Sequence, residues 1–348
     1  DSSSSFCLVT SEFIATISAV IGNLDITEIK TMQDFSSASA LLKIDMEALA
    51  ANYRLFQEKT GQGCNVSGVV KANAYGLGLK PVVEKLTALG CPQFFVATLD
   101  EAMALRDFNK KTPVAVLGGL FKGAEKEYLA HDIIPVLNCP DDVKRWQNLA
   151  AEKEASLPGI LHFDTGMNRL GFSKKETYDL IESPEMLANI DVQLIMSHFV
   201  NADEKDDPIT QKQANAFAEI AAHFPNVHKS LANSPGLFRD ESYHYDLVRP
   251  GFSLYGGNPT PETKNPVRPV VNLSARILQI RECKSGDSIG YGASHVFDRP
   301  TSTATLALGY ADGFLRSASN KATLYWQGEA CPVIGRVSMD LVTIDLSG

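Results

Sequence analysis

The sequence lacks clustered cysteines and long hydrophobic runs. Its six cysteines are Cys7, Cys64, Cys91, Cys139, Cys283 and Cys331. They form no CxxC pair and show no metal-ligand spacing, so neither a disulfide framework nor a metal site is expected, and isolated thiols are typical of a reducing cytoplasm. No apolar run reaches the roughly 18 residues that a membrane-spanning helix needs.

Positive charge is also scarce. The chain has 32 Lys and Arg against 41 Asp and Glu, which gives a net charge of -9. This balance argues against binding to nucleic acid or to an anionic membrane surface. An anionic ligand must therefore be bound by local arginines and backbone N–H groups rather than by an overall positive field.

Residues 1–40 contain no Lys or Arg before Lys30, so the charged start of a signal peptide is missing. Apolar residues recur at helical spacing between Phe13 and Leu24, and serines flank this stretch. We expect an extension, either flexible or a short helix, with no chemistry of its own.

From residue 41 to residue 268, short apolar runs alternate with amphipathic stretches. The eight runs lie near residues 66–71, 94–98, 114–118, 133–137, 160–164, 192–197, 228–232 and 247–255. Helical patterns lie between them, for example at 79–89, 141–154 and 209–224. Eight strand–helix repeats predict an α/β fold with a closed (β/α)₈ barrel of the TIM type. No GxGxxG follows a predicted strand, which weakens the case for a dinucleotide-binding fold.

After Pro269 the pattern changes to strand-like runs separated by turn residues. The runs cover residues 273–281, 301–308, 330–337 and 341–346, and the turns contain Gly286, Gly313 and Gly328. This predicts a second, mainly antiparallel β domain over residues 269–348. Residues 41–45 are assigned to the start of the barrel segment. They could also supply one more strand to the β domain.

Lys71 stands where the first predicted strand ends, in the segment VVKANAYG (residues 69–76). Burial lowers the pKa of a lysine and makes its amine a usable nucleophile. The alternative is a structural lysine that extends from the strand end to solvent.

Other polar residues follow later strands. They are Arg169, His198, Asn233, Ser234 and Arg249. Active sites of such barrels lie at the carboxyl ends of the strands, and the loops after the last two strands often bind phosphate, for which Ser234 and the N–H groups near Gly251 are suitable donors. A lysine nucleophile, phosphate donors and an arginine facing a ring together suggest pyridoxal 5′-phosphate (PLP) as the cofactor.

Seven motifs stand out along the chain. They are VVKANAYG (69–76), DTGMNRLG (164–171), Asn233-Ser234, RPGFSLYG (249–256), GYGA (290–293), GYADG (309–313) and GRVSMD (335–340). In these motifs the chain resembles the alanine racemases. The resemblance spans residues 42–346 and implies a PLP-dependent, cytoplasmic isomerase that interconverts L- and D-alanine and supplies D-alanine for peptidoglycan.

The resemblance also implies roles for single residues. Lys71 is expected to hold PLP covalently and to act as the base for the D enantiomer. Tyr291 is expected to be the base for the L enantiomer, supplied by the partner subunit of a homodimer. The other residues expected to bind the cofactor are Tyr75, His198, Asn233, Ser234, Arg249, Gly251 and Tyr255. Those expected to bind the substrate are Arg169, Tyr310, Met339 and Asp340.

Three features depart from the family pattern. His162 occupies the position of a lysine that is often carbamylated, Leu77 replaces a histidine, and the sequence ends at Gly348, before the family's usual end. We expect a neutral His162 to orient Arg169 through one accepted hydrogen bond. With an ordinary histidine pKa of ~6.5, affinity for alanine should then fall on acidification just below neutrality.

Three alternatives remain at the sequence level. A racemase of the same fold with broader substrate specificity would share all these motifs. A PLP decarboxylase of similar fold would place an acidic residue at the ring nitrogen of PLP. The residue expected at that position here is Arg249, which argues against a decarboxylase. A PLP-binding homeostasis protein would lack the domain that contains Tyr291.

Overall fold

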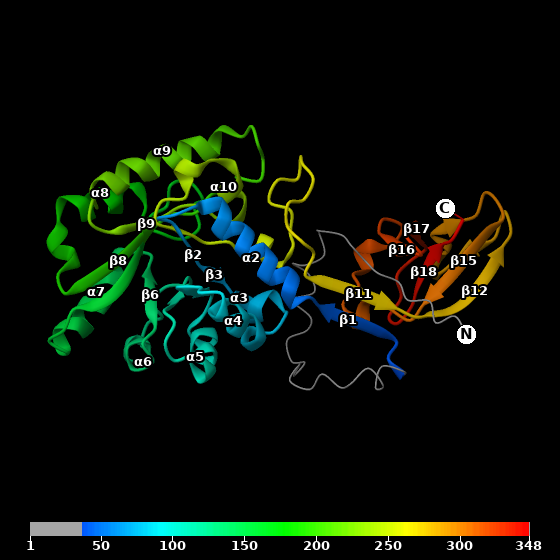
Figure 1. Cartoon of the computed structure of the whole chain (residues 1–348), viewed down its shortest axis with the longest axis horizontal. Coiled ribbons are helices and arrows are strands. Elements are labelled where there is room, and N and C mark those ends of the chain that lie inside the picture. The colour runs from blue at the N-terminus through cyan, green and yellow to red at the C-terminus, as the bar shows by residue number, and fades with distance from the viewer. Residues whose placement is uncertain (1–36, 348) are drawn as a thin grey trace. The chain divides into compact units, whose positions relative to one another are not determined.

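The structure, a computed structural model, describes residues 37–347 (Figure 1). It divides into two compact units. The barrel unit is Met46–Arg268, and the β unit combines residues 37–45 with residues 269–347. The predicted extension, residues 1–40, lies outside the described residues except for its last four positions. Among the helices of residues 37–347, none is long and apolar enough to cross a membrane.

The barrel unit contains a parallel sheet of seven strands in sequential order. These are β3 (Gly68–Val69), β4 (Phe94–Val96), β5 (Val114–Val116), β6 (Ile134–Leu137), β7 (Leu157–His162), β8 (Ile190–Met196) and β9 (His228–Ser230). Two further strands, β2 (Asn65–Val66) and β10 (Leu247–Val248), pair in parallel. The alternation of strands with helices is visible in Figure 1.

Backbone hydrogen bonds close this sheet into a barrel. Only Ser67 separates β2 from β3, and its N–H donates to Val248 O (3.0 Å), while Val69 N–H donates to Pro250 O (3.2 Å). On the other side of β10, Arg249 N–H donates to Ala232 O (3.0 Å), next to β9. The first strand therefore meets the eighth, and the predicted barrel is confirmed.

Helices connect the strands of the barrel. They are α2 (Met46–Thr60), α4 (Leu79–Ala88), α5 (Leu99–Phe108), α6 (Glu125–Ala130), α7 (Pro140–Glu152), α8 (Lys174–Glu182), α9 (Pro208–Ala222) and α10 (Ser234–Arg239). Their starts follow from local chemistry: Thr98 and Glu101 form a capping box before α5, and Ser173 and Glu176 form another before α8. The side chains that fill the barrel centre are mainly Val, Ile, Leu and Phe, including Phe95, Val136, Ile160 and Leu194.

The eighth strand differs from its prediction. The apolar run at residues 247–255 was expected to be a strand, but β10 ends at Val248 and the short helix η5 (Phe252–Tyr255) follows. Pro250 has no N–H to donate to a ladder, which explains the early end of the strand. Gly251 then provides a turn without a side chain.

The β unit is built from antiparallel strands, as predicted. Strand β1 (Ala40–Ile44) pairs with β11 (Val271–Ala275), so residues 41–44 belong with this unit. A five-stranded sheet has the order β12-β15-β18-β17-β16. Its strands are β12 (Ile277–Cys283), β15 (Thr301–Leu306), β16 (Thr323–Trp326), β17 (Glu329–Ile334) and β18 (Val342–Asp345), and a small hairpin joins β13 (Ser288–Ile289) to β14 (His295–Val296).

Strand β16 was not predicted from the sequence. It pairs with β17 through a two-residue turn at Gln327 and Gly328, whose φ values are 54° and 90°. Positive φ at both positions is the signature of the tight hairpin turns that match strand twist.

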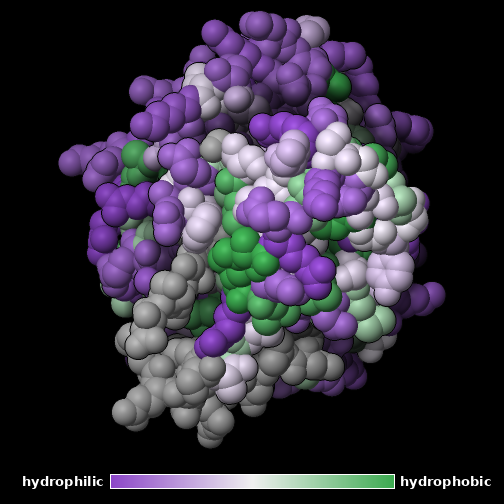
Figure 2. Space-filling view, turned by 90° about the vertical axis from the view of Figure 1, so that its right-hand side faces the viewer, coloured by the Kyte–Doolittle hydropathy of each residue, from purple (hydrophilic) through white to green (hydrophobic). Residues whose placement is uncertain are grey.

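Large hydrophobic side chains of the β unit remain exposed, with Leu278, Ile280 and Val296 each at least half accessible. Hydrophobic surface among polar residues is also visible in Figure 2.

The buried side chain of Asn52 joins α2 to the end of the barrel unit. Its Nδ2 donates to Leu254 O (3.2 Å) and Arg268 O (2.9 Å), and its Oδ1 accepts from Arg268 N–H (2.7 Å). An Asn52→Leu variant leaves these backbone groups without partners. We expect its free energy of unfolding to fall by about 2–4 kcal/mol, measured by urea denaturation. Gln57→Leu, at an exposed position of the same helix, is the control, and an equal loss in both variants would contradict this account.

Candidate active site

A cavity of about 330 Å³ lies in the barrel unit where the strands end at their carboxyl side. The predicted site residues among its lining are Lys71, Tyr75, Arg169, His198, Asn233, Ser234, Arg249 and Gly251, and His162 also lines it. The structure therefore brings together eight predicted residues from loops that are far apart in the sequence.

Lys71 begins a short turn, α3 (Lys71–Tyr75), with unusual backbone geometry. Four consecutive residues, Ala72 to Tyr75, have φ values between 53° and 56°, which is the left-handed region. The left-handed conformation costs each non-glycine residue roughly 1–2 kcal/mol, so the turn requires stabilising contacts from its surroundings. Glu101 supplies part of it, because its carboxylate accepts Ala72 N–H (2.5 Å) and Ala97 N–H (2.7 Å). Asn73 Oδ1 accepts Leu79 N–H (2.7 Å).

The environment of Lys71 favours its neutral form. Burial lowers the pKa of its amine, and the nearby Arg169 lowers it further, whereas Glu101 acts in the opposite direction. A lysine with a lowered pKa has a larger neutral fraction near pH 7, and only the neutral amine is a nucleophile.

Arg249 is the most deeply buried cation of the cavity. Its Nη1 donates to Ser230 Oγ, and its Nη2 donates to Ser197 O (2.5 Å) and to His198 Nδ1 (3.5 Å). Its Nε has no partner within the described residues. Burial lowers the pKa of Arg249 to about 9, so the guanidinium still carries its charge at neutral pH. Burial and the charge of Arg249 lower the pKa of His198 well below its usual value, so that imidazole is neutral.

Hydroxyl and N–H donors gather at the other end of the cavity. Ser234 Oγ accepts from Gly251 N–H (3.0 Å) and Ser253 N–H (3.2 Å). Gly251 lies so close to the Tyr75 hydroxyl that a Cβ at this position would clash with it. Burial raises the pKa of Tyr75 to about 12, which keeps its hydroxyl protonated. This end can therefore donate hydrogen bonds to an anion.

Aromatic packing holds Tyr75 in place. Its ring lies against that of Tyr255, with centroids 4.6 Å apart, and the Tyr255 hydroxyl donates to Val69 O (2.9 Å). Asn233 is used in the local structure, since its Oδ1 accepts Gly236 N–H (3.1 Å) and its Nδ2 donates to Phe199 O (3.4 Å).

The donor set fits PLP. Hydroxyl and amide donors would hold the phosphate, the unpartnered Nε of Arg249 would meet the ring nitrogen, and the Lys71 amine would bond the aldehyde carbon. A second buried hydroxyl near the phosphate end, Ser253 Oγ, has no hydrogen-bond partner within the described residues.

Arg169 belongs to a loop that Asp164 organises. The Asp164 carboxylate accepts the N–H groups of Gly166, Met167 and Asn168, each at 2.8 Å. Arg169 itself is exposed and makes no hydrogen bond or ion pair with another described residue. The cavity thus presents a guanidinium available for a carboxylate.

His162, at the end of β7, corrects one expectation. Burial lowers its pKa to about 4, and the charges of Arg249 and Arg169 also disfavour its protonation. Its ring is neutral well below pH 7, so a loss of affinity caused by its protonation is expected near pH 4 and not just below neutrality.

The remaining predicted residues lie in the β unit. Tyr291, in the turn η6 (Tyr291–Ala293), is 72% exposed. Tyr310 N–H donates to Ser338 O (3.1 Å) and Ala311 N–H donates to Met339 O (3.0 Å), which brings the two loops of Tyr310 and Met339 together. Met339 and Asp340 are exposed. All four residues belong to the β unit, whereas the cavity lies in the barrel unit.

Sequence reasoning missed two residues near this cavity. Glu101 supports the turn after Lys71, and Asn138 contacts His162. Asn138 follows the fourth predicted strand directly, so its place at a strand end was a signal that could have identified it. Glu101 was recognisable in the sequence only as part of a helix-capping box.

The fold and the cavity together define the class of this protein, a PLP-binding enzyme with a (β/α)₈ barrel. The sequence matches the alanine racemase N-terminal domain over residues 44–259 and the alanine racemase C-terminal domain over residues 270–348. The chain belongs to the alanine racemase family.

Relatives agree with this assignment. The alanine racemase of Rhodospirillum rubrum is 46% identical over 311 residues, covering 89% of this chain and 83% of the relative. The crystal structure of alanine racemase from Bartonella henselae with covalently bound pyridoxal phosphate is 38% identical, with a TM-score of 0.83, covering 89% of this chain and 86% of that one. The biosynthetic enzyme of Pseudomonas aeruginosa is 30% identical, with a TM-score of 0.80 and the same coverage.

The low pKa of His162 has a consequence for stability. Its pKa is about 4 in the folded protein and ~6.5 when unfolded. Between these values the unfolded chain binds more protons, so the free energy of unfolding falls as the pH is lowered. From pH 7.5 to 4.5 we expect a loss of about 2–3 kcal/mol from this residue. The measurement is urea denaturation of wild type and His162→Gln at both pH values. Equal losses in the two proteins would show that His162 is not the group responsible.

Proposed function

We propose that this protein interconverts L- and D-alanine with PLP as its cofactor. The observation that carries the proposal is the arrangement of Lys71, Arg249 and the donors around Ser234 in one cavity of a chain from the alanine racemase family. When bound, PLP withdraws electrons from Cα of an amino acid and so makes its C–H bond acidic.

The residues of the barrel unit would have separate roles in binding and in proton transfer. Ser234, Tyr75 and the Gly251 N–H would hold the phosphate, and Lys71 would bind the cofactor covalently and move the proton on one face of Cα. Arg249 keeps its own proton, because its pKa of about 9 lies above neutrality. A cationic donor at the ring nitrogen discourages protonation of that nitrogen, which would limit side reactions such as transamination.

The substrate carboxylate would bind Arg169. The cavity contains three cationic side chains, Lys71, Arg169 and Arg249, and no carboxylate among its lining residues in the described part of the chain. A guanidinium without a protein partner is suited to bidentate binding of a carboxylate. Met339 and Asp340 are the other residues that we propose as substrate contacts.

A second base is needed on the opposite face of Cα, since racemisation removes a proton from one side and returns it on the other. We assign this role to Tyr291, and we propose that Tyr310 lines the entrance to the active site. Tyr291 is 72% exposed in a single chain, whereas a base has to be screened from water to work efficiently. A homodimer in which Tyr291 reaches the partner's cavity would supply that screening.

The first test is activity and cofactor attachment. Holoprotein incubated with L-alanine should yield equal amounts of both enantiomers, measured by chiral chromatography. Lys71→Ala should form no D-alanine and should retain no PLP after borohydride reduction and peptide mapping, because no other lysine among residues 37–347 lines the cavity. Lys80→Ala, on the exposed side of α4, is the control. PLP fixed to a different lysine in the wild type would overturn the assignment.

The second test concerns the dimer. Lys71→Ala and Tyr291→Phe should each be nearly inactive alone. If Tyr291 serves the partner's cavity, mixed dimers contain one site with both defects and one intact site. Refolding equal amounts together should then restore about a quarter of wild-type activity, since half of the dimers are mixed. If Tyr291 served its own chain's cavity, each mixed dimer would contain two defective sites and the mixture would stay inactive.

A further inference from the structure

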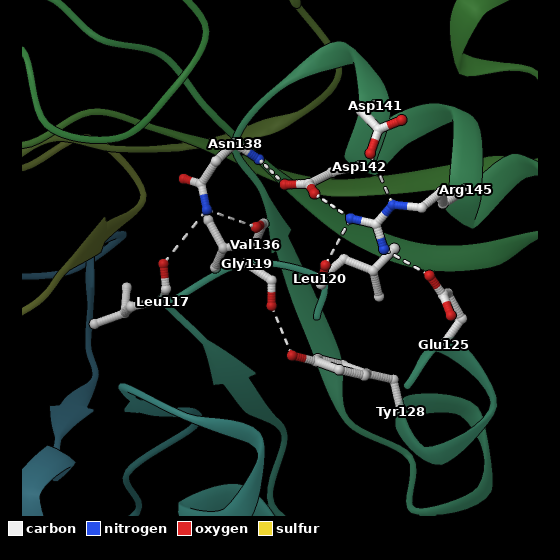
Figure 3. A network of polar contacts seen from close by, with 10 residues as sticks. All are labelled: Leu117, Gly119, Leu120, Glu125, Tyr128, Val136, Asn138, Asp141, Asp142 and Arg145. Atoms are coloured by element: carbon white, nitrogen blue, oxygen red, sulfur yellow. Dashed lines mark hydrogen bonds and ion pairs between the residues drawn. The ribbon is translucent and has the colours of Figure 1, made fainter. Parts of the chain in front are cut away.

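The side chain of Asn138 has only one orientation that satisfies its neighbours. Its Nδ2 lies 3.1 Å from Val136 O and 3.5 Å from Leu117 O. Figure 3 draws both contacts as dashed lines. Carbonyl oxygens only accept hydrogen bonds, so the amide nitrogen has to face them. The amide oxygen therefore faces the opposite way, where His162 Nδ1 lies 2.8 Å from Oδ1.

This contact determines the tautomer of His162. An amide oxygen accepts hydrogen bonds and cannot donate, so the hydrogen of the neutral imidazole has to be on Nδ1. Nε2 then carries a lone pair and is an acceptor. No described residue donates a hydrogen bond to this Nε2.

The loop that carries Asn138 is held by a polar network (Figure 3). Asn138 N–H donates to Asp142 Oδ2 (2.9 Å), and Asp142 Oδ1 pairs with Arg145 Nη2 (2.6 Å). Arg145 also pairs with Glu125 (2.5 Å). Satisfied networks of this kind rigidify the segments that they join.

The charged groups that face His162 influence its protonation. Arg249 and Arg169 disfavour its protonation, Asp164 favours it, and His198 is itself neutral. Burial contributes most, and with the pKa of His162 lowered to about 4 its imidazole is neutral near pH 7. A neutral ring with a lone pair on Nε2 can accept a hydrogen bond from a cation without repelling it.

Arg169 is the nearby cation to which such an acceptor could bind. It lines the same cavity as His162, and its guanidinium has no hydrogen-bond partner among residues 37–347. A guanidinium has only donors, so its orientation has to be set by acceptors in the wall or by the ligand.

We propose that Asn138 is a positioning residue, which fixes His162 with its hydrogen on Nδ1 so that Nε2 accepts a hydrogen bond from Arg169 and orients its guanidinium toward the substrate carboxylate. This inference rests on the proposed function, in which Arg169 binds that carboxylate. Asn138 itself is not among the residues that line the cavity.

The test compares holoenzyme of wild type and Asn138→Ala, both labelled with ¹⁵N at histidine. In the wild type, His162 Nδ1 should show the chemical shift of a protonated nitrogen and Nε2 that of an unprotonated one between pH 6 and 8. In Asn138→Ala, part of the population should move its hydrogen to Nε2. KM for alanine should rise roughly tenfold, the effect of losing a hydrogen bond to a charged group, with little change in kcat.

Tyr128→Phe is the matched control, because it removes a buried hydrogen bond from the same region without touching Asn138. It should lower stability and leave both KM and the ¹⁵N shifts of His162 unchanged. A wild-type His162 with hydrogen on Nε2, an unchanged KM in Asn138→Ala, or an equal rise of KM in Tyr128→Phe would each overturn the inference. The ¹⁵N shifts do not depend on turnover, so a wild type that forms no D-alanine would count against the proposed function alone.

Discussion

The hydrogen bonds between the first and last strands of the barrel determine the rest of the site. Ser67 and Val69 donate to carbonyls at and just beyond β10, which places Lys71 and Arg249 at the same end of the barrel. The Tyr255 hydroxyl, from the segment after β10, donates to Val69 O and reinforces the same junction. Without this closure, the lysine and the arginine would belong to opposite edges of an open sheet.

The cavity concentrates positive charge in a chain that is negative overall. Lys71, Arg169 and Arg249 line one space, and burial lowers the pKa of Lys71 and of Arg249. This charge is costly in the absence of a ligand, and a phosphate and a carboxylate would offset it. Burial, together with this charge, keeps His162 and His198 neutral, and His198 Nδ1 accepts a hydrogen bond from Arg249.

Much of the barrel and of its cavity could be predicted from sequence, because strand–helix alternation and polar residues at strand ends are local patterns. The left-handed turn at residues 72–75 could not, since nothing in Ala-Asn-Ala-Tyr indicates positive φ without glycine. The low pKa of His162 depends on burial and on charges from distant loops, which local sequence does not encode. The early end of β10 was readable at Pro250, whereas the role of Asn138 required its contact with His162.

In the proposed reaction, two groups on opposite faces of Cα move the proton. The most direct measurement is the isotope content of both enantiomers early in a reaction that starts from L-alanine in D₂O. Two separate bases predict D-alanine that carries deuterium at Cα, while the unreacted L-alanine keeps its protium. D-alanine that retains much of the original protium would show that a single base returns the same proton, and would contradict the account.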